Sequence, residues 1–108
     1  MIRQINVREL SALLAANQPI YLLDVRQPWE HELAALPNST LIPLDQLPNR
    51  ADEMKPPDNA AVVVYCHHGI RSQSGVAILQ RLGYDNVASL AGGIDAWSLH
   101  VDPKVPRY

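Results

Sequence analysis

Apolar residues along the chain fall into two alternating patterns. Continuous apolar runs suit strands that are covered on both faces, and they predict strands at 2–5, 20–25, 40–42, 61–65 and 86–90. Apolar residues spaced by three and four predict helices, and these lie at 7–16, 28–33, 44–50, 94–98 and in the segment between Ser72 and Gly83. Strands that alternate with helices are typical of an α/β domain with a mainly parallel sheet.

Residues at the segment ends support these boundaries. Asn6 and Glu9 have the spacing of a capping box, in which the two side chains satisfy free N–H groups at a helix start. Pro28 suits the first turn of a short helix, because that position needs no N–H donor. Gly83 predicts the end of the preceding helix, and Tyr84 can supply the apolar contact of its C-terminal cap.

The run 61–65 is the most β-branched in the chain and predicts a central strand. It ends at Cys66, the only cysteine, and a turn and a helical pattern follow. The residues expected on the core face of that helix are Gly75, Ile78, Leu79 and Leu82. A turn and a helix N-terminus can direct backbone N–H groups at one sulfur atom. Such surroundings stabilise a thiolate, the form in which cysteine acts as a nucleophile.

Composition and charge narrow the classes of function. A chain of 108 residues fits one domain, and its net charge of −2 gives no general attraction to nucleic acid or to an anionic membrane. Any anion site must therefore be built locally. One cysteine forms no internal disulfide, and no signal-peptide or membrane-spanning run is found, so we expect a cytoplasmic protein. Residues 101–108 lack a periodic pattern and are expected to form an extended arm.

Three segments, in order, resemble the single-domain rhodaneses, a family of sulfurtransferases. Segment 22–30, LLDVRQPWE, is similar to the family's first signature, a strand ending in Asp-Val-Arg and a helix that carries Glu. Segment 65–72, YCHHGIRS, resembles the active-site loop Cys-x-x-Gly-x-Arg-Ser, and segment 90–97, LAGGIDAW, resembles the closing Leu-x-Gly-Gly-x-x-x-Trp. The resemblance implies one rhodanese-like domain over 1–108, a three-layer fold with helices on both faces of the sheet.

The family resemblance also implies an activity. In this family a cysteine accepts a sulfane sulfur as a covalent persulfide, which implies that Cys66 is catalytic and that no separate cofactor is needed. The implied donor is a small molecule such as thiosulfate, and the implied acceptor is cyanide, a thiol or a sulfur-relay protein. The other implied loop residues are His67, His68, Gly69, Ile70, Arg71 and Ser72. Asp24 and Arg26 are implied to brace the mouth of the site.

Each loop residue type has a physical role of its own. Gly69 allows a backbone conformation that other residues avoid. Arg71 can hold the loop by hydrogen bonds or present its charge to an anionic donor. Ser72 is expected to be the N-cap of the following helix, with a hydroxyl that faces the sulfur as the alternative. His67 and His68 either supply donors to an anionic substrate or point at water.

Three further side chains have structural interpretations. Arg26 is expected to form an ion pair with Asp24 or Glu30. Trp29 and Trp97 are expected to be packing residues rather than substrate-stacking ones.

One segment departs from the family pattern. Residues 34–39 read AALPNS, where the family usually has Gly-His-Ile-Pro-Gly-Ala. Asn38 preserves the character of the turn, because Asn tolerates the left-handed conformation. Ala35 stands where the family has histidine, so this chain lacks a polar group near the turn.

Four other interpretations compete for the same loop. Cysteine-dependent phosphatases use Cys-x5-Arg, whereas four residues separate Cys66 from Arg71 here, a smaller ring that suits a persulfide better than a phosphate. A non-catalytic rhodanese-like binding or regulatory module usually lacks the cysteine. A redox sensor needs a second cysteine to resolve an oxidised one. A metal site needs more ligands than Cys66 and two adjacent histidines provide, so we expect no metal.

Overall fold

The computed structural model describes residues 2–108. Within them, five strands form a single sheet. The strand order is β1-β5-β4-β2-β3, and every neighbouring pair is parallel. The strands are β1 (Gln4–Ile5), β2 (Ile20–Asp24), β3 (Thr40–Leu41), β4 (Ala61–Tyr65) and β5 (Val87–Leu90). β4 is the central strand, as its β-branched residues predicted.

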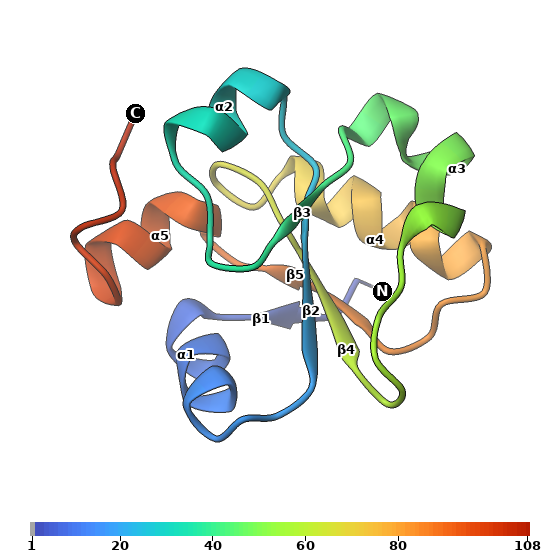
Figure 1. Ribbon diagram of the computed structural model, residues 1–108, viewed down its shortest axis with the longest axis horizontal. Coiled ribbons are helices and arrows are strands. Elements are labelled where there is room, and N and C mark those ends of the chain that lie inside the picture. The colour runs from blue at the N-terminus through green and yellow to red at the C-terminus, as the bar shows by residue number, and fades with distance from the viewer. Residues whose placement is uncertain (1) are drawn as a thin grey trace.

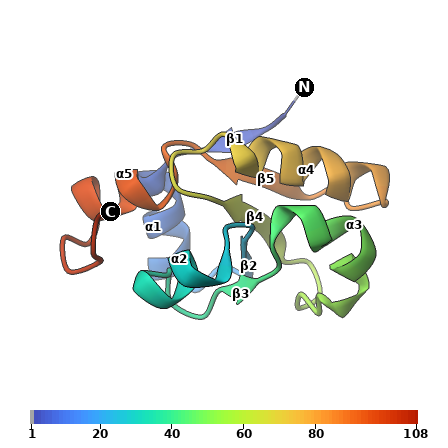
Figure 2. The same cartoon turned by 90° about the horizontal axis from the view of Figure 1, so that it is seen from above.

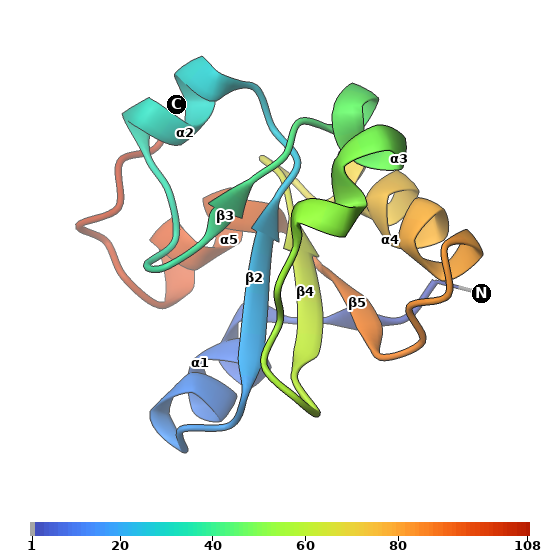
Figure 3. The same cartoon turned by 45° about the vertical axis from the view of Figure 1, so that its right-hand side comes forward.

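Helices cover both faces of this sheet (Figure 2, Figure 3). Their bounds are α1 (Val7–Ala15), α2 (Pro28–Leu33), α3 (Leu47–Arg50), α4 (Arg71–Arg81) and α5 (Gly93–His100). α1 and α5 lie together on one face, α3 and α4 on the other, and α2 sits above the carboxyl ends of the strands (Figure 1). The predicted three-layer α/β fold is therefore confirmed.

Alternation along β4 divides its side chains between two apolar clusters, because successive strand residues point to opposite faces. Val63 and Tyr65 join the cluster under α1 and α5. Val64 and the following Cys66 join the cluster under α3 and α4. The thiol therefore lies on the side of the sheet covered by the helix that follows it.

The predicted caps are present. The Asn6 side chain accepts a hydrogen bond from the N–H of Glu9 (2.8 Å), and the Glu9 carboxylate accepts one from the N–H of Asn6 (3.1 Å). Gly83 has φ +101°, and the N–H of Tyr84 donates to the carbonyl of Leu79 (3.0 Å), the pattern that ends many helices.

The expected core face of α4 needs one correction. Leu82 is half exposed, whereas Val76 is fully buried. Leu82 is the C-cap of α4, with φ −87° and ψ 2°, so the helical spacing no longer applies at that residue. The segment expected as one helix over 44–50 begins as a 3-10 turn (Leu44–Gln46) before α3.

The arm at 101–108 is less extended than expected. It turns where the N–H of Val105 donates to the carbonyl of Asp102 (3.1 Å), and it then runs back toward α2 (Figure 1). Val105 and Tyr108 pack against the apolar cluster under α1 and α5. Among the residues described, none of the helices has both the length and the apolar character needed to cross a bilayer.

Candidate active site

Cys66 lies directly after β4, at the carboxyl edge of the sheet, and residues 67–70 turn the chain into α4. The Cys66 Sγ accepts hydrogen bonds from the backbone N–H groups of Gly69 (3.2 Å) and Ser72 (3.3 Å). Gly69 has φ +98°, a conformation that aims its N–H at the sulfur and that favours glycine. These amides and the first turn of α4 favour negative charge on the sulfur.

The first turn of α5 holds the loop from its other side. The N–H of Ile94 donates to the carbonyl of Cys66 (2.9 Å), and the N–H of Asp95 donates to the carbonyl of His67 (3.1 Å). Gly93, with φ +60°, makes this approach possible, because a side-chain carbon there would overlap the same two carbonyl groups. The Gly-Gly segment therefore serves the cysteine loop directly.

Ser72 was expected to be the N-cap of α4, and the structure shows that it is not. It lies inside α4, whose N-cap is Ile70. A serine cap is not required, because the Cys66 sulfur already accepts the N–H of Ser72. The Ser72 hydroxyl lies 3.5 Å from the Cys66 Sγ and 2.7 Å from the hydroxyl of Ser89 on β5. Sequence reasoning missed Ser89, since one serine in a short apolar strand carries no chemical signal.

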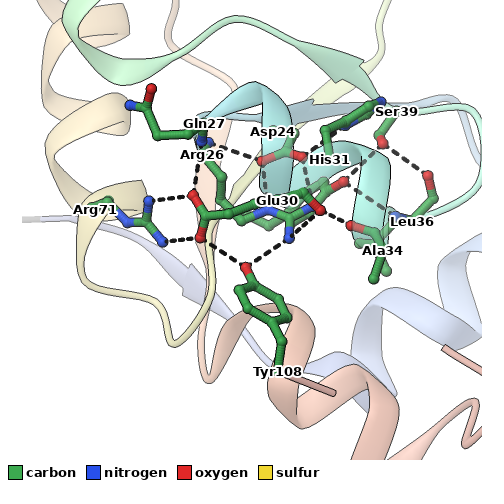
Figure 4. Close-up of polar contacts among 11 residues, drawn as sticks. Asp24, Arg26, Gln27, Glu30, His31, Ala34, Leu36, Ser39, Arg71 and Tyr108 are labelled. Carbon is green, nitrogen blue, oxygen red and sulfur yellow. Dashed lines mark hydrogen bonds and ion pairs between the residues drawn. The ribbon is translucent and has the colours of Figure 1, made fainter. Parts of the chain in front are cut away.

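Arg71 is tied to α2 by a two-point ion pair (Figure 4). Its two terminal nitrogens donate to the two carboxylate oxygens of Glu30, each at 2.9 Å. The N–H of Gln27 also donates to Glu30 (2.8 Å). The Arg71 hydrogen bonds lower the pKa of Glu30 to about 2, against the opposing effect of burial. Of the two roles expected for Arg71, holding the loop is the one that its contacts show.

Asp24 and Arg26 form a fully buried ion pair beneath α2 (Figure 4). The Arg26 guanidinium donates to both carboxylate oxygens of Asp24 (2.8 and 2.7 Å), so Asp24 is its partner rather than Glu30. A further hydrogen bond from Arg26 reaches the carbonyl of Ala34 (2.6 Å), within the segment that departs from the family pattern. The His31 Nδ1 lies 2.8 Å from Asp24 and supplies a histidine contact from α2.

Tyr108, at the end of the arm, joins the two ion pairs (Figure 4). Its hydroxyl donates to Glu30 (2.8 Å) and accepts a hydrogen bond from Arg26 (2.8 Å). Its ring stacks on the imidazole of His67, with ring centres 3.9 Å apart and an angle of 5° between the planes. The sequence contains no sign of these contacts, because 78 residues separate Tyr108 from Glu30.

The two loop histidines differ in their surroundings. The His67 ring lies between Tyr108 and His68, and its Nε2 is buried without a partner among residues 2–108. Burial, and secondarily the neighbouring His68, lower the pKa of His67. The side chain of His68 is 61% exposed and lies 3.9 Å from Asp95. His68 therefore faces solvent, whereas His67 is covered.

The two tryptophans also differ. Trp97 is buried in the cluster under α1 and α5, as expected. Trp29 is 60% exposed, so its assignment as a packing residue was wrong. It belongs to the first turn of α2 and makes an edge contact with the Tyr108 ring, at 5.8 Å between centres. Ile70, within the cysteine loop, is also exposed.

No group of three or more histidine, cysteine, aspartate or glutamate residues within 2–108 is arranged to hold a metal ion. The fold and the loop define an α/β protein in which backbone amides hold a cysteine sulfur at the carboxyl edge of a parallel sheet.

The chain belongs to the rhodanese-like sulfurtransferase family. The family model for the rhodanese-like domain matches residues 6–100. A sulfurtransferase from Allochromatium vinosum is 36% identical over 105 residues, which cover 97% of this chain and 96% of that protein. The adenylyltransferase and sulfurtransferase uba4 of Ogataea parapolymorpha is also 36% identical, but this chain spans only 26% of its length.

Solved structures agree with this assignment. A rhodanese-like domain protein from Staphylococcus aureus superposes with a TM-score of 0.82 at 28% identity, over 99% of both chains. A thiosulfate sulfurtransferase from Pseudomonas aeruginosa superposes with a TM-score of 0.81 at 29% identity, over 91% of this chain and 19% of the other.

Proposed function

We propose that this protein carries a sulfane sulfur as a persulfide on Cys66 and passes it to a thiophilic acceptor. The observation that carries the proposal is the pair of backbone N–H groups, from Gly69 and Ser72, that donate to the Cys66 sulfur. They stabilise negative charge without a neighbouring base. The mechanism therefore requires only protein groups and no cofactor.

The first half-reaction uses the Cys66 thiolate as nucleophile. It attacks the outer sulfur of a donor such as thiosulfate, a bond forms between Sγ and that sulfur, and sulfite leaves with the electron pair of the broken S–S bond. In the second half-reaction an acceptor attacks the outer sulfur of the persulfide, and the Cys66 thiolate leaves. Cyanide yields thiocyanate, and a thiol or a partner protein yields a new persulfide.

Thiosulfate as donor is supported by the similarity to the Pseudomonas aeruginosa thiosulfate sulfurtransferase. A protein acceptor is supported by relatives named adenylyltransferase and sulfurtransferase, in which a domain of this kind is one part of a longer chain. We propose that the protein works in the reducing cytoplasm, where its single thiol stays available for sulfur transfer.

Steady-state turnover tests this function. The wild-type protein is expected to form thiocyanate from thiosulfate and cyanide, and Cys66→Ser is expected to form none. The loop has four residues between Cys66 and Arg71, so no hydrolysis of an aryl phosphate is expected. Phosphate release that depends on Cys66, without sulfur transfer from thiosulfate or a low-molecular-weight persulfide, would show that the protein is a phosphatase instead.

A further inference from the structure

Three buried side-chain atoms form a chain that ends at the reactive sulfur. The Cys66 Sγ lies 3.5 Å from the Ser72 Oγ, which lies 2.7 Å from the Ser89 Oγ. All three residues are at most 1% exposed. Ser89 belongs to β5 and pairs in register with Val64 of β4, two residues before the cysteine. The second hydroxyl of the chain is therefore held by the sheet rather than by the loop.

We propose that Ser89 is a positioning residue that, through Ser72, directs a hydroxyl hydrogen at the Cys66 sulfur whenever that sulfur is negatively charged. Among the residues described, the Ser89 hydroxyl forms a hydrogen bond only with the Ser72 hydroxyl and none with the sulfur. The role of these two serines in turnover rests on the function proposed above. Their effect on the free Cys66 thiolate is independent of that function.

Counting hydrogens gives the physical reason. When Cys66 is a thiol, its S–H and the two serine O–H groups supply three hydrogens. Only two contacts join the three side chains, so one hydrogen has no acceptor among them. When Cys66 is a thiolate, the Ser89 O–H donates to Ser72 and the Ser72 O–H donates to the sulfur. Every hydrogen then has an acceptor. A buried polar group without a partner is costly, so the chain favours the thiolate.

Hydrogen bonds in series also strengthen one another. A hydroxyl that accepts a hydrogen bond becomes a better donor, particularly where water is excluded. The Cys66 thiolate is the nucleophile of the first half-reaction and the leaving group of the second. Stabilisation by Ser89 is therefore expected to affect kcat, while the KM for thiosulfate stays close to that of the wild type.

The alternative is that Ser89 only satisfies its own buried hydroxyl. Ser98 provides the control, because it is also a buried serine and its hydroxyl donates to the carbonyl of Ile94 (3.1 Å) within α5, away from the sulfur. Ser98→Ala removes a buried hydroxyl that makes no hydrogen bond to the Cys66 sulfur, to Ser72 or to Ser89. None of these serine substitutions alters the charged and titratable groups around the loop, which are Glu30, His67, His68, Arg71, Asp95 and Tyr108.

The test measures alkylation of Cys66 by iodoacetamide as a function of pH. The proteins are the wild type, Ser72→Ala, Ser89→Ala, the double variant and Ser98→Ala, each first checked by circular dichroism and thermal unfolding. We expect Ser89→Ala to move the profile to higher pH and to lower the rate on its acidic side roughly three- to tenfold. Since Ser89 acts through Ser72, the double variant should match Ser72→Ala, and Ser98→Ala should match the wild type.

A Ser89→Ala profile equal to that of Ser98→Ala would overturn the proposal, and so would effects of Ser72→Ala and Ser89→Ala that add in full. Alkylation needs no sulfur donor, so these outcomes are independent of the proposed function. If the wild type transfers sulfur and Ser89→Ala has the kinetics of Ser98→Ala, the function stands and the role of Ser89 fails. If none of the proteins transfers sulfur but the alkylation profiles differ as expected, the role of Ser89 stands and the proposed function fails.

Discussion

Gly93 shows how much of the site depends on a single residue without a side chain. Its positive φ and its contact with the carbonyls of Cys66 and His67 bring the first turn of α5 against the loop. Two hydrogen bonds from α5 then hold those carbonyls in place. The loop amides can therefore remain directed at Cys66.

Gly93→Ala is expected to destabilise the protein by more than about 2 kcal/mol, because the new methyl group overlaps backbone rather than a flexible side chain. Urea unfolding measures this loss. Gly83→Ala is the matched control, since Gly83 also has a positive φ (+101°) but nothing lies within 4 Å of the added carbon. Backbone strain alone predicts about 1 kcal/mol there. Equal losses in the two variants would show that close approach to the loop is unimportant.

Among the elements, α2 is joined to the cysteine loop through the ion pair of Glu30 with Arg71. It is short, and its capping arrangement uses Glu30, which accepts the N–H of Gln27 and both terminal nitrogens of Arg71. The carboxylate that begins this helix therefore also holds the arginine of the cysteine loop.

Glu30→Gln is expected to reduce the free energy of unfolding at neutral pH by about 1 to 3 kcal/mol, less than for a fully buried pair because Arg71 is 37% exposed. The folded-state pKa of Glu30 is lowered from 4.5 to about 2 by Arg71. Its contribution is thus present above pH 4.5 and disappears as the pH falls toward 2. Urea unfolding at several pH values measures this window.

The control is Glu53→Gln, which removes one partner of an exposed pair with Arg50 and should change the free energy of unfolding little. A constant deficit between pH 5 and pH 2 would contradict the ion-pair explanation.

The order and type of the elements could be predicted from the sequence, because apolar spacing and capping residues are local signals. The Asn6 capping box and the helix end at Gly83 are examples. The family resemblance also located Cys66 and its loop. The partner of Arg71 could not be predicted from local signals, because Glu30 lies 41 residues away and satisfies the helix N-terminus of α2 as well. Ser89 and Tyr108 were missed for the same reason, since their roles arise only when the chain is folded.

At the scale of the whole molecule, the C-terminal arm (101–108) brings Tyr108 into contact with the residues around the cysteine loop. Tyr108 connects the buried Asp24–Arg26 pair with the Glu30–Arg71 pair, and its ring covers His67. The last residue of the sequence is thereby linked to β2, to α2 and to the cysteine loop. We expect the chain to unfold in one cooperative transition, as a single domain would.

Two substitutions separate the hydroxyl of Tyr108 from its ring. Tyr108→Phe removes two hydrogen bonds and is expected to cost about 1 kcal/mol. Tyr108→Ala also removes the stacked ring, which should cost about 1 kcal/mol more and expose His67 to water. Because burial is the main cause that lowers the pKa of His67, that pKa should rise in Tyr108→Ala and stay low in Tyr108→Phe. NMR titration of the imidazole measures it. An unchanged pKa in Tyr108→Ala would show that the arm does not shield the loop.

The central claim is that Cys66 holds a transferable sulfur, and intact mass spectrometry after incubation with thiosulfate tests it most directly. The wild-type protein is predicted to gain the mass of one sulfur atom and to lose it when cyanide is added. Cys66→Ser is predicted to gain none. A wild-type protein that gained no sulfur from thiosulfate or from a low-molecular-weight persulfide would contradict this role of Cys66, and so would a Cys66→Ser variant that gained as much as the wild type.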